Sequence, residues 1–106
     1  MIFSTIANTM NIEQSIHSLC ETLTKQWADK HGPTAYPVTY SKGRKYFKLI
    51  NDHGSQRSVY CFIDIDGNVY KSATWNRPAE GIRFHIDQLL EHPQMCDMFG
   101  SFLYKR

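Results

Sequence analysis

The chain has 106 residues, of which 42% are hydrophobic and 21% charged, and it carries a formal net charge of +2 at pH 7. These values exclude an intrinsically disordered chain, which needs fewer apolar residues and a larger net charge. They are typical of one globular domain over residues 1–106, which buries roughly two-thirds of the surface that its unfolded form exposes. No segment approaches the ~18 apolar residues of a membrane span, so we expect no membrane partner.

The three cysteines, Cys20, Cys61 and Cys96, are odd in number and widely spaced. This pattern argues against a disulfide framework and is typical of a reducing compartment, so we expect a cytoplasmic protein. Residues 1–10 contain no basic residue, no long apolar run and no cleavage signal, and we expect no signal peptide there. They are weakly patterned and are expected to form a frayed terminus or a short edge segment, with Met10 as an alternative start.

The positive charge is concentrated in the middle of the chain. Residues 30–60 contain six Lys and Arg against Asp52 alone, whereas residues 1–29 contain one base and three acids. Such a block could attract phosphate or an acidic partner, although a solvated loop is the commoner reason for clustered lysines.

Hydrophobic residues at helical spacing predict a helix over residues 11–31. They form a single apolar stripe of Ile12, Ile16, Leu19, Cys20, Leu23 and Trp27. Asn11 is a suitable N-cap with Gln14 as its capping-box partner, and Gly32-Pro33 ends the helix. A helix with one apolar face is expected to cover a sheet.

The clearest strand pair in the chain lies on either side of Asp66-Gly67-Asn68. Segments 57–65 and 69–74 are rich in β-branched and aromatic residues, and glycine permits the tight reversal between them. A strand over 44–50 precedes this central hairpin.

Two registers are open to the hairpin. A type I turn with Gly67 as a bulge pairs Phe62 with Tyr70 and Ile63 with Val69. A two-residue turn would instead pair Ile63 with Tyr70 and mix polar with apolar side chains on both faces. We prefer the bulged form because it keeps the two faces distinct.

The preferred register gives the sheet an apolar face and an aromatic, polar face. The expected core face consists of Phe47, Leu49, Val59, Cys61, Ile63, Val69 and Ala73. The other face consists of Tyr46, Lys48, Tyr60, Phe62, Tyr70 and Ser72.

The rest of the chain is expected to hold shorter elements. They are a connection over 33–43 with a short extended piece at Val38–Tyr40, a loop over 75–81, a strand over 82–86, a helix over 87–92 and a docked closing strand over 99–106. The predicted class is α+β, with an amphipathic N-terminal helix packed on an antiparallel sheet of three to five strands that includes the central hairpin.

Short motifs from Tyr46 onward resemble small proteins encoded by tailed bacteriophages, many of them marine. They are Tyr46-Phe-Lys-Leu-Ile, Arg57-Ser-Val-Tyr-Cys-Phe-Ile-Asp, Asp66-Gly-Asn-Val-Tyr-Lys, Ala73-Thr-Trp, Pro78-Ala, Gly81-Ile-Arg and the closing Gly100-Ser-Phe-Leu-Tyr. The similarity covers roughly half of the chain and leaves the N-terminal helix outside it. The resemblance implies a viral origin and an infected bacterial cytoplasm, but it implies no activity, cofactor or site residue.

Metal-binding motifs are incomplete in this chain. Asp64-Ile-Asp66-Gly67 resembles the start of an EF-hand loop, but the twelfth position, where Glu is needed, is Trp75. His92 and Cys96 have helical spacing, yet Pro93 lies between them and no further ligand pair accompanies them. We predict no metal site and no cofactor.

A nucleophilic cysteine needs a nearby base and partial exposure. Cys20 lies in the helical stripe and Cys61 on the expected core face, so both are interpreted as packing residues. Cys96 is the one thiol expected to be exposed, and no base can be named for it. We therefore predict no catalytic residue and a non-enzymatic protein.

The candidate binding surface is the aromatic and basic face of the sheet. Six Tyr, six Phe and two Trp exceed what a small core holds, so some rings should lie at the surface. The surface consists of Tyr46, Lys48, Tyr60, Phe62 and Tyr70, edged by Lys71, Trp75 and Arg77. Alternatively, a second layer built from residues 82–106 would bury the same rings as core.

Two functions suit such a surface. Rings that stack on bases and cations that follow phosphates would bind single-stranded nucleic acid, and charge reversal at Lys42, Arg44, Lys45 and Lys48 would then weaken binding. The same rings also suit an interface with a host or phage protein, or with a second copy in a homodimer. We rank the protein-binding or homodimeric module first, because the net charge is small for a nucleic-acid binder.

Overall fold

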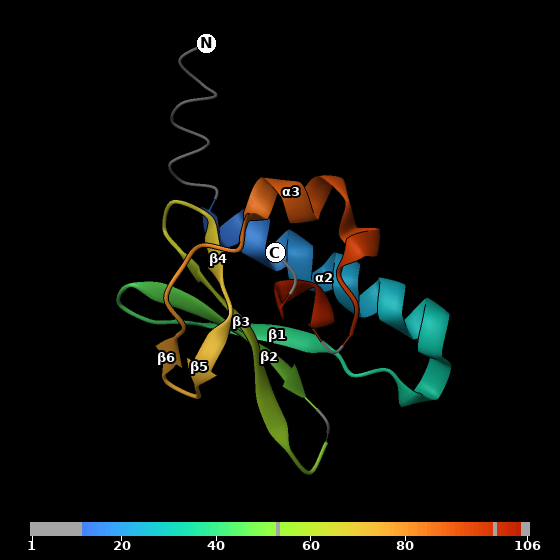
Figure 1. Ribbon diagram of the computed structural model, residues 1–106. Helices are drawn as coiled ribbons and strands as arrows, with labels where there is room; N and C mark the ends of the chain where they lie inside the picture. Colours follow the sequence, from blue (N-terminus) through green and yellow to red (C-terminus); the bar gives the residue numbers. More distant parts are fainter. Residues whose placement is uncertain (1–11, 53, 99, 105–106) are drawn as a thin grey trace.

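The computed structural model describes residues 12–52, 54–98 and 100–104 and arranges them as one long helix against a five-stranded sheet (Figure 1). The helix is α2 (Ile12–His31), and all neighbouring strands of the sheet are antiparallel. The strand order is β1 (Val38–Lys42), β2 (Tyr46–Asp52), β3 (Arg57–Asp64), β4 (Asn68–Tyr70) and β7 (Phe84–His85). The predicted α+β class, with its helix, antiparallel sheet and central hairpin, is confirmed.

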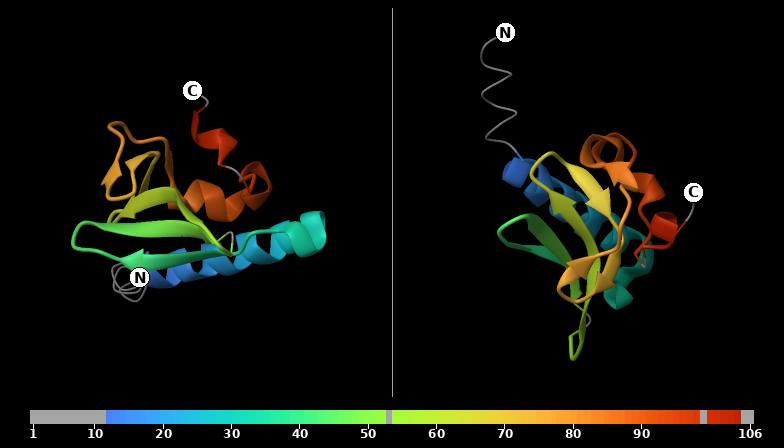
Figure 2. Two further views of the ribbon diagram at one scale, coloured as in Figure 1. Left: turned by 90° about the horizontal axis from the view of Figure 1, so that it is seen from below. Right: turned by 60° about the vertical axis from the view of Figure 1, so that its left-hand side comes forward.

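Smaller elements surround this framework. They are the two-stranded hairpin of β5 (Ser72–Thr74) and β6 (Arg77–Pro78), the helix α3 (Ile86–Glu91), and the 3-10 turns η1 (Gly32–Thr34), η2 (Pro93–Met95) and η3 (Ser101–Tyr104). In the left view of Figure 2 the β5–β6 hairpin stands apart from α2. The predicted strand and helix over 82–92 are present in outline as β7 and α3.

Helix α2 buries the apolar stripe that the sequence predicts. Its fully covered residues are Ile16, Leu19, Cys20, Leu23 and Trp27, and Ile12 is half-buried against them. They share one core with Phe47 and Leu49 of β2, and burying each such side chain contributes about 1.5–3 kcal/mol. The predicted N-cap at Asn11 and the expectations for residues 1–10 lie outside the described residues.

The central hairpin has the bulged register. Phe62 pairs with Tyr70 and Ile63 with Val69, as predicted. Gly67 has φ 89°, and its N–H donates to the Asp64 carbonyl over 3.0 Å. The turn residues therefore follow local chemistry that is readable from the sequence.

The prediction that Tyr60 lies on the outer face is wrong. Leu49 pairs with Cys61 while Ile50 pairs with Val59, so Tyr60 is an extra residue in a β-bulge. The bulge turns its side chain into the core, where it is 5% exposed and its ring lies 5.2 Å from that of Trp27. Val59, expected in the core, is only half-buried.

The predicted strand over 69–74 divides into two elements. Its first part is β4 of the main sheet, whereas β5 leaves the sheet and pairs with β6 inside the segment that was expected to be a loop. Ala73 consequently lies at the surface and not in the core. The hairpin folds back toward Lys48 on the outer face of the sheet.

The closing strand expected over 99–106 is also corrected, because its described residues contain η3 (Ser101–Tyr104) and no strand. The expected docking of the terminus is nevertheless found: Phe102 and Leu103 are buried, and the Phe102 ring lies 5.4 Å from that of Phe84. A 3-10 turn sends both consecutive apolar side chains toward the core, whereas a strand would send them to opposite faces.

Three side chains from the helix and the sheet hold the chain just before η3. Trp27 Nε1 donates to Cys96 O over 2.9 Å, the Tyr60 hydroxyl to Asp97 O over 2.7 Å, and Asn51 Nδ2 to Met98 O over 2.9 Å. These hydrogen bonds attach the C-terminal segment to α2, β2 and β3.

Candidate functional site

A cleft of about 250 Å³ lies beside the turn between β1 and β2. Its wall carries the cations Lys42, Arg44, Lys45 and Lys48, with Tyr46, Phe62 and Asn76 beside them. None of the described residues that line it is acidic. The cleft therefore favours an anionic ligand.

Gly43 gives the cationic turn its tight shape. Its N–H donates to the Tyr46 carbonyl over 2.9 Å, and a Cβ at this position would lie 3.0 Å from the same oxygen. The close approach favours glycine between Lys42 and Arg44, and the turn holds both cations at the mouth of the cleft.

Trp75 extends this basic surface along the outer face. It lies in the turn of the β5–β6 hairpin and is 40% exposed, with Lys48 Nζ 4.3 Å from its ring centroid. Lys48 Nζ also donates to Asn76 Oδ1 over 3.3 Å, and the Arg57 guanidinium carbon lies 5.6 Å from the Trp75 ring. These cation–π contacts bring two positive charges against the Trp75 indole.

The other rings of the outer face pack mainly on one another. Tyr46 meets Phe62 and Tyr70 edge to face, with ring centroids 6.0 Å and 5.6 Å apart. Phe62 is only 3% exposed, while Tyr46 and Tyr70 are half-buried. Phe62 is therefore part of the floor and is not accessible for stacking.

The predicted surface is thus assembled in part. Tyr46, Lys48, Phe62, Tyr70 and Trp75 come together on the outer face.

The remaining predicted surface residues lie elsewhere or at the edge. Tyr60 is in the core, and Lys71 turns away so that its Nζ lies 4.5 Å from the ring of Tyr104. Arg77 is exposed on β6 next to the turn. Sequence reasoning did not place Arg57 and Asn76 on this surface, because their contacts depend on the fold-back of the hairpin.

Asp64 and Tyr70 form a hydrogen-bonded pair at the end of this face. The Tyr70 hydroxyl donates to Asp64 Oδ2 over 2.9 Å, and the backbone N–H groups of Asp66 and Asn68 donate to Asp64 Oδ1. Burial would raise the pKa of Asp64, but these hydrogen bonds outweigh burial and lower it. The hydrogen bond to Asp64 raises the pKa of Tyr70 to about 12, with burial contributing in the same direction.

All three thiols are buried, and the expectation that Cys96 is exposed is wrong, because it is 1% exposed. Burial raises the pKa of Cys20 to about 12 and that of Cys61 well above its usual value. Burial, with a smaller effect of the Asp97 charge, raises the pKa of Cys96 to about 12. At neutral pH all three are protonated packing residues and weak nucleophiles.

Within residues 12–52, 54–98 and 100–104, no group of three or more His, Cys, Asp or Glu side chains is placed to hold a metal ion. The same part of the chain contains no helix that is both long enough and apolar enough to cross a membrane.

These features define a small α+β domain with a cationic cleft at one end of its sheet. The family of unknown function DUF7717 matches residues 4–105 of the sequence, and the chain belongs to this family. No curated protein and no solved structure matches the chain. The family description names no activity, so the function has to be inferred from the side chains themselves.

Proposed function

We propose that this protein binds single-stranded nucleic acid along a basic track on the outer face of its sheet. The basic track consists of Lys42, Arg44, Lys45, Lys48, Arg57 and Trp75. The observation that carries the proposal is the cleft in which every charged lining residue is a cation, with an exposed indole 4.3 Å from one of them. Cations that follow phosphates and rings that stack on bases are the two elements of single-strand recognition.

The low net charge of +2 favours a protein partner only when charge is averaged over the molecule. Association with a polyanion depends on the field of one face, and five of the twelve Lys and Arg residues lie on the basic track. Among the described residues, Lys42 is the one cation of the track with an ion-pair partner, Glu13 at 3.4 Å. The other four cations have no ion-pair partner in this part of the chain, although Lys48 and Arg57 lie against the Trp75 ring.

The proposed role is non-enzymatic, and the burial of all three thiols supports it. A phage origin, with action in the cytoplasm of an infected bacterium, is proposed from the sequence resemblance alone. A protein partner is proposed for a different surface below.

The proposal is tested by fluorescence anisotropy with labelled oligothymidine, oligouridine and duplex DNA of about 20 nucleotides, in about 50 mM salt. Trp75→Ala is expected to weaken single-strand binding about 5- to 150-fold, since stacking contributes about 1–3 kcal/mol per base. The matched control is Tyr104→Ala, which removes another exposed ring that lies against a lysine but is not on the track. Its affinity should stay within about twofold of the wild type.

Three outcomes would overturn the proposal. In the first, the wild type does not bind nucleic acid. In the second, Trp75→Ala and Tyr104→Ala lose equal affinity. In the third, the wild type binds duplex DNA as tightly as single strands and Trp75→Ala has no effect. Circular dichroism of both variants would show that each remains folded.

A further inference from the structure

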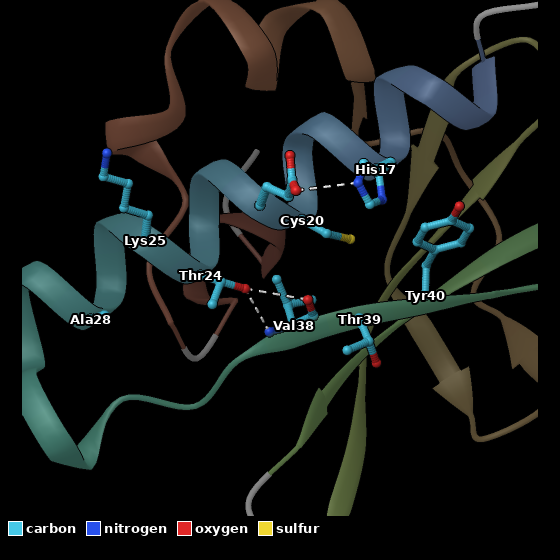
Figure 3. Close-up of a pocket in the computed structure, with 9 residues that line it drawn as sticks. His17, Cys20, Thr24, Lys25, Ala28, Val38, Thr39 and Tyr40 are labelled. Atoms are coloured by element: carbon cyan, nitrogen blue, oxygen red, sulfur yellow. Dashed lines mark hydrogen bonds and ion pairs between the residues drawn. The ribbon is translucent and has the colours of Figure 1, made fainter.

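A second surface lies between α2 and the edge strand β1, which run side by side (Figure 2). A groove of about 660 Å³ opens there, and Figure 3 shows residues from both elements around it. Cys20, Thr24 and Ala28 line it from the helix, and Val38 and Tyr40 line it from the strand. The groove is mainly apolar and is separate from the aromatic outer face.

The backbone N–H and C=O groups of β1 point alternately toward β2 and away from it. Two hydrogen-bonded pairs mark the ends of the β1–β2 ladder: the Asp52 N–H donates to Pro37 O, and the Gly43 N–H donates to Tyr46 O. The residues between these two pairs are paired without a break in register. In an antiparallel ladder the hydrogen-bonded pairs alternate with pairs whose N–H and C=O groups point away from the neighbour. Val38, Tyr40 and Lys42 therefore direct their backbone groups away from β2.

Thr24 occupies one end of this edge. Its hydroxyl accepts from the Val38 N–H at 3.1 Å and donates to the Val38 carbonyl at 3.3 Å (Figure 3). The outward groups of Tyr40 and Lys42 come next, and β1 is the last strand on this side of the sheet among the described residues. This leaves a short strand edge beside an apolar groove, the arrangement that binds peptides by strand addition.

We propose that this groove binds an extended peptide as an added strand, antiparallel to β1. The peptide backbone pairs with Tyr40 and Lys42, and every second side chain turns toward α2. The apolar lining near Cys20, Ala28 and Val38 suits a small or β-branched apolar side chain.

Charge gives the peptide a preferred orientation. On the helix side of the groove Glu21 lies 3.3 Å from His17, a contact that is an ion pair only when the imidazole is protonated, and Lys25 has no ion-pair partner among the described residues. Lys25 follows Thr24 and so lies at the Val38 end. An antiparallel strand ends there, so a carboxylate in the last part of the peptide, from a side chain or the C-terminus, meets Lys25.

A short peptide fits this edge better than a second copy of the chain. The Thr24 hydroxyl reaches the outward groups of Val38, so α2 already stands beside the strand edge. A second copy that paired through its own β1 would bring its own α2 into the same space. This inference does not rest on nucleic-acid binding, because it concerns the backbone edge of β1 and the groove beside α2; Lys42 is the residue that this edge shares with the basic track.

The test is selection of a displayed library of random peptides of about seven residues on the immobilised full chain. The selected peptides are then measured by anisotropy against Ala28→Trp, which fills the groove from an exposed helix position. A loss of at least about tenfold is expected. The matched control is Thr22→Trp, also exposed on α2 but outside the groove lining, which should bind like the wild type.

Two further measurements examine the backbone and the charge. Methylation of successive peptide amides should abolish binding at every second position only, because alternate amides face β1. Lys25→Glu should weaken peptides that carry the carboxylate by about fivefold.

The inference is overturned if no peptide is enriched whose binding Ala28→Trp removes, or if methylation lacks the alternation. A dimer in light scattering that Ala28→Trp dissociates would assign the groove to a second copy and would equally overturn it. Arg44→Gln with Lys45→Gln should leave peptide affinity unchanged, so failure here and failure of nucleic-acid binding are distinguishable.

Discussion

The basic track should make nucleic-acid affinity depend steeply on salt. Replacing Arg44 and Lys45 together by Gln removes two of the four cations that line the cleft and leaves the backbone of the turn unchanged. Both side chains are exposed, so the fold should tolerate the change with less than about 0.5 kcal/mol of effect each.

The size of the effect follows from the number of cations. Each phosphate neutralised on a single strand contributes about −0.7 to the slope of log K against log salt. The four track cations without an ion-pair partner among the described residues, Arg44, Lys45, Lys48 and Arg57, therefore predict a slope of about −2.8. Affinity should then fall about 50-fold between about 50 and 200 mM salt. With two cations left, the slope should be about −1.4 and the fall about sevenfold.

The assay is anisotropy of labelled oligothymidine over that salt range. The control replaces Lys30 and Lys71 by Gln, which removes the same formal charge away from the cleft. Its slope should equal that of the wild type. Equal slopes in both double variants, or a fall that follows net charge alone, would refute the assignment of phosphate contacts to the cleft.

Three further predictions concern the fold and the outer face. Tyr60→Phe should lower the free energy of urea unfolding by about 0.5–1.5 kcal/mol, because the hydrogen bond from the Tyr60 hydroxyl to the Asp97 carbonyl is lost. Gly67→Ala should cost about 2–4 kcal/mol in the same assay, because φ is 89° and the new Cβ would lie 2.7 Å from the His85 ring. Asp64→Asn should lower the free energy of unfolding at neutral pH. Because the folded-state pKa of Asp64 is lowered, the wild type should be the more stable protein above about pH 4, and this difference in stability should disappear as pH falls through the lowered pKa. In this variant, alkaline absorbance titration should show the pKa of Tyr70 falling from about 12.

Each of these predictions has a control or a contrary result. Tyr104→Phe, at an exposed ring, should stay within about 0.5 kcal/mol of the wild type. Gly81→Ala should cost only its backbone strain of about 1–2 kcal/mol, because φ is 97° but nothing lies within 4 Å of the new Cβ. A stability gap between wild type and Asp64→Asn that stays constant from neutral to acid pH would contradict the role given to the Asp64 carboxylate.

Local sequence was sufficient to predict the elements that depend on a repeating hydrophobic pattern or on residues close together in the chain. The stripe of α2 repeats at helical spacing, and the turn at Gly67 sets the register of the Phe62 and Tyr70 pair. Neighbouring residues carry both signals, because helix periodicity and turn chemistry act over a few positions.

The sequence predicted which types of residue form the candidate site, but it predicted only some of the residues that belong to it. The block of bases over 30–60 left open a phosphate ligand, an acidic partner or a solvated loop, and four of these bases line the cleft. The contact of Lys48 with Trp75 joins residues far apart in the chain and depends on the hairpin leaving the sheet after Tyr70.

By itself, then, the sequence determined the helix, the hairpin register, the α+β class and the cationic character of the middle segment. Only the tertiary structure decided that Tyr60 enters the core, that β5 folds over the outer face and that Cys96 is buried. Strict alternation along a strand assumes an unbroken ladder, and one bulge residue changes which face a side chain meets. The burial of Cys96 likewise depends on a residue far away in the sequence. The indole N–H of Trp27 donates a hydrogen bond to the Cys96 carbonyl.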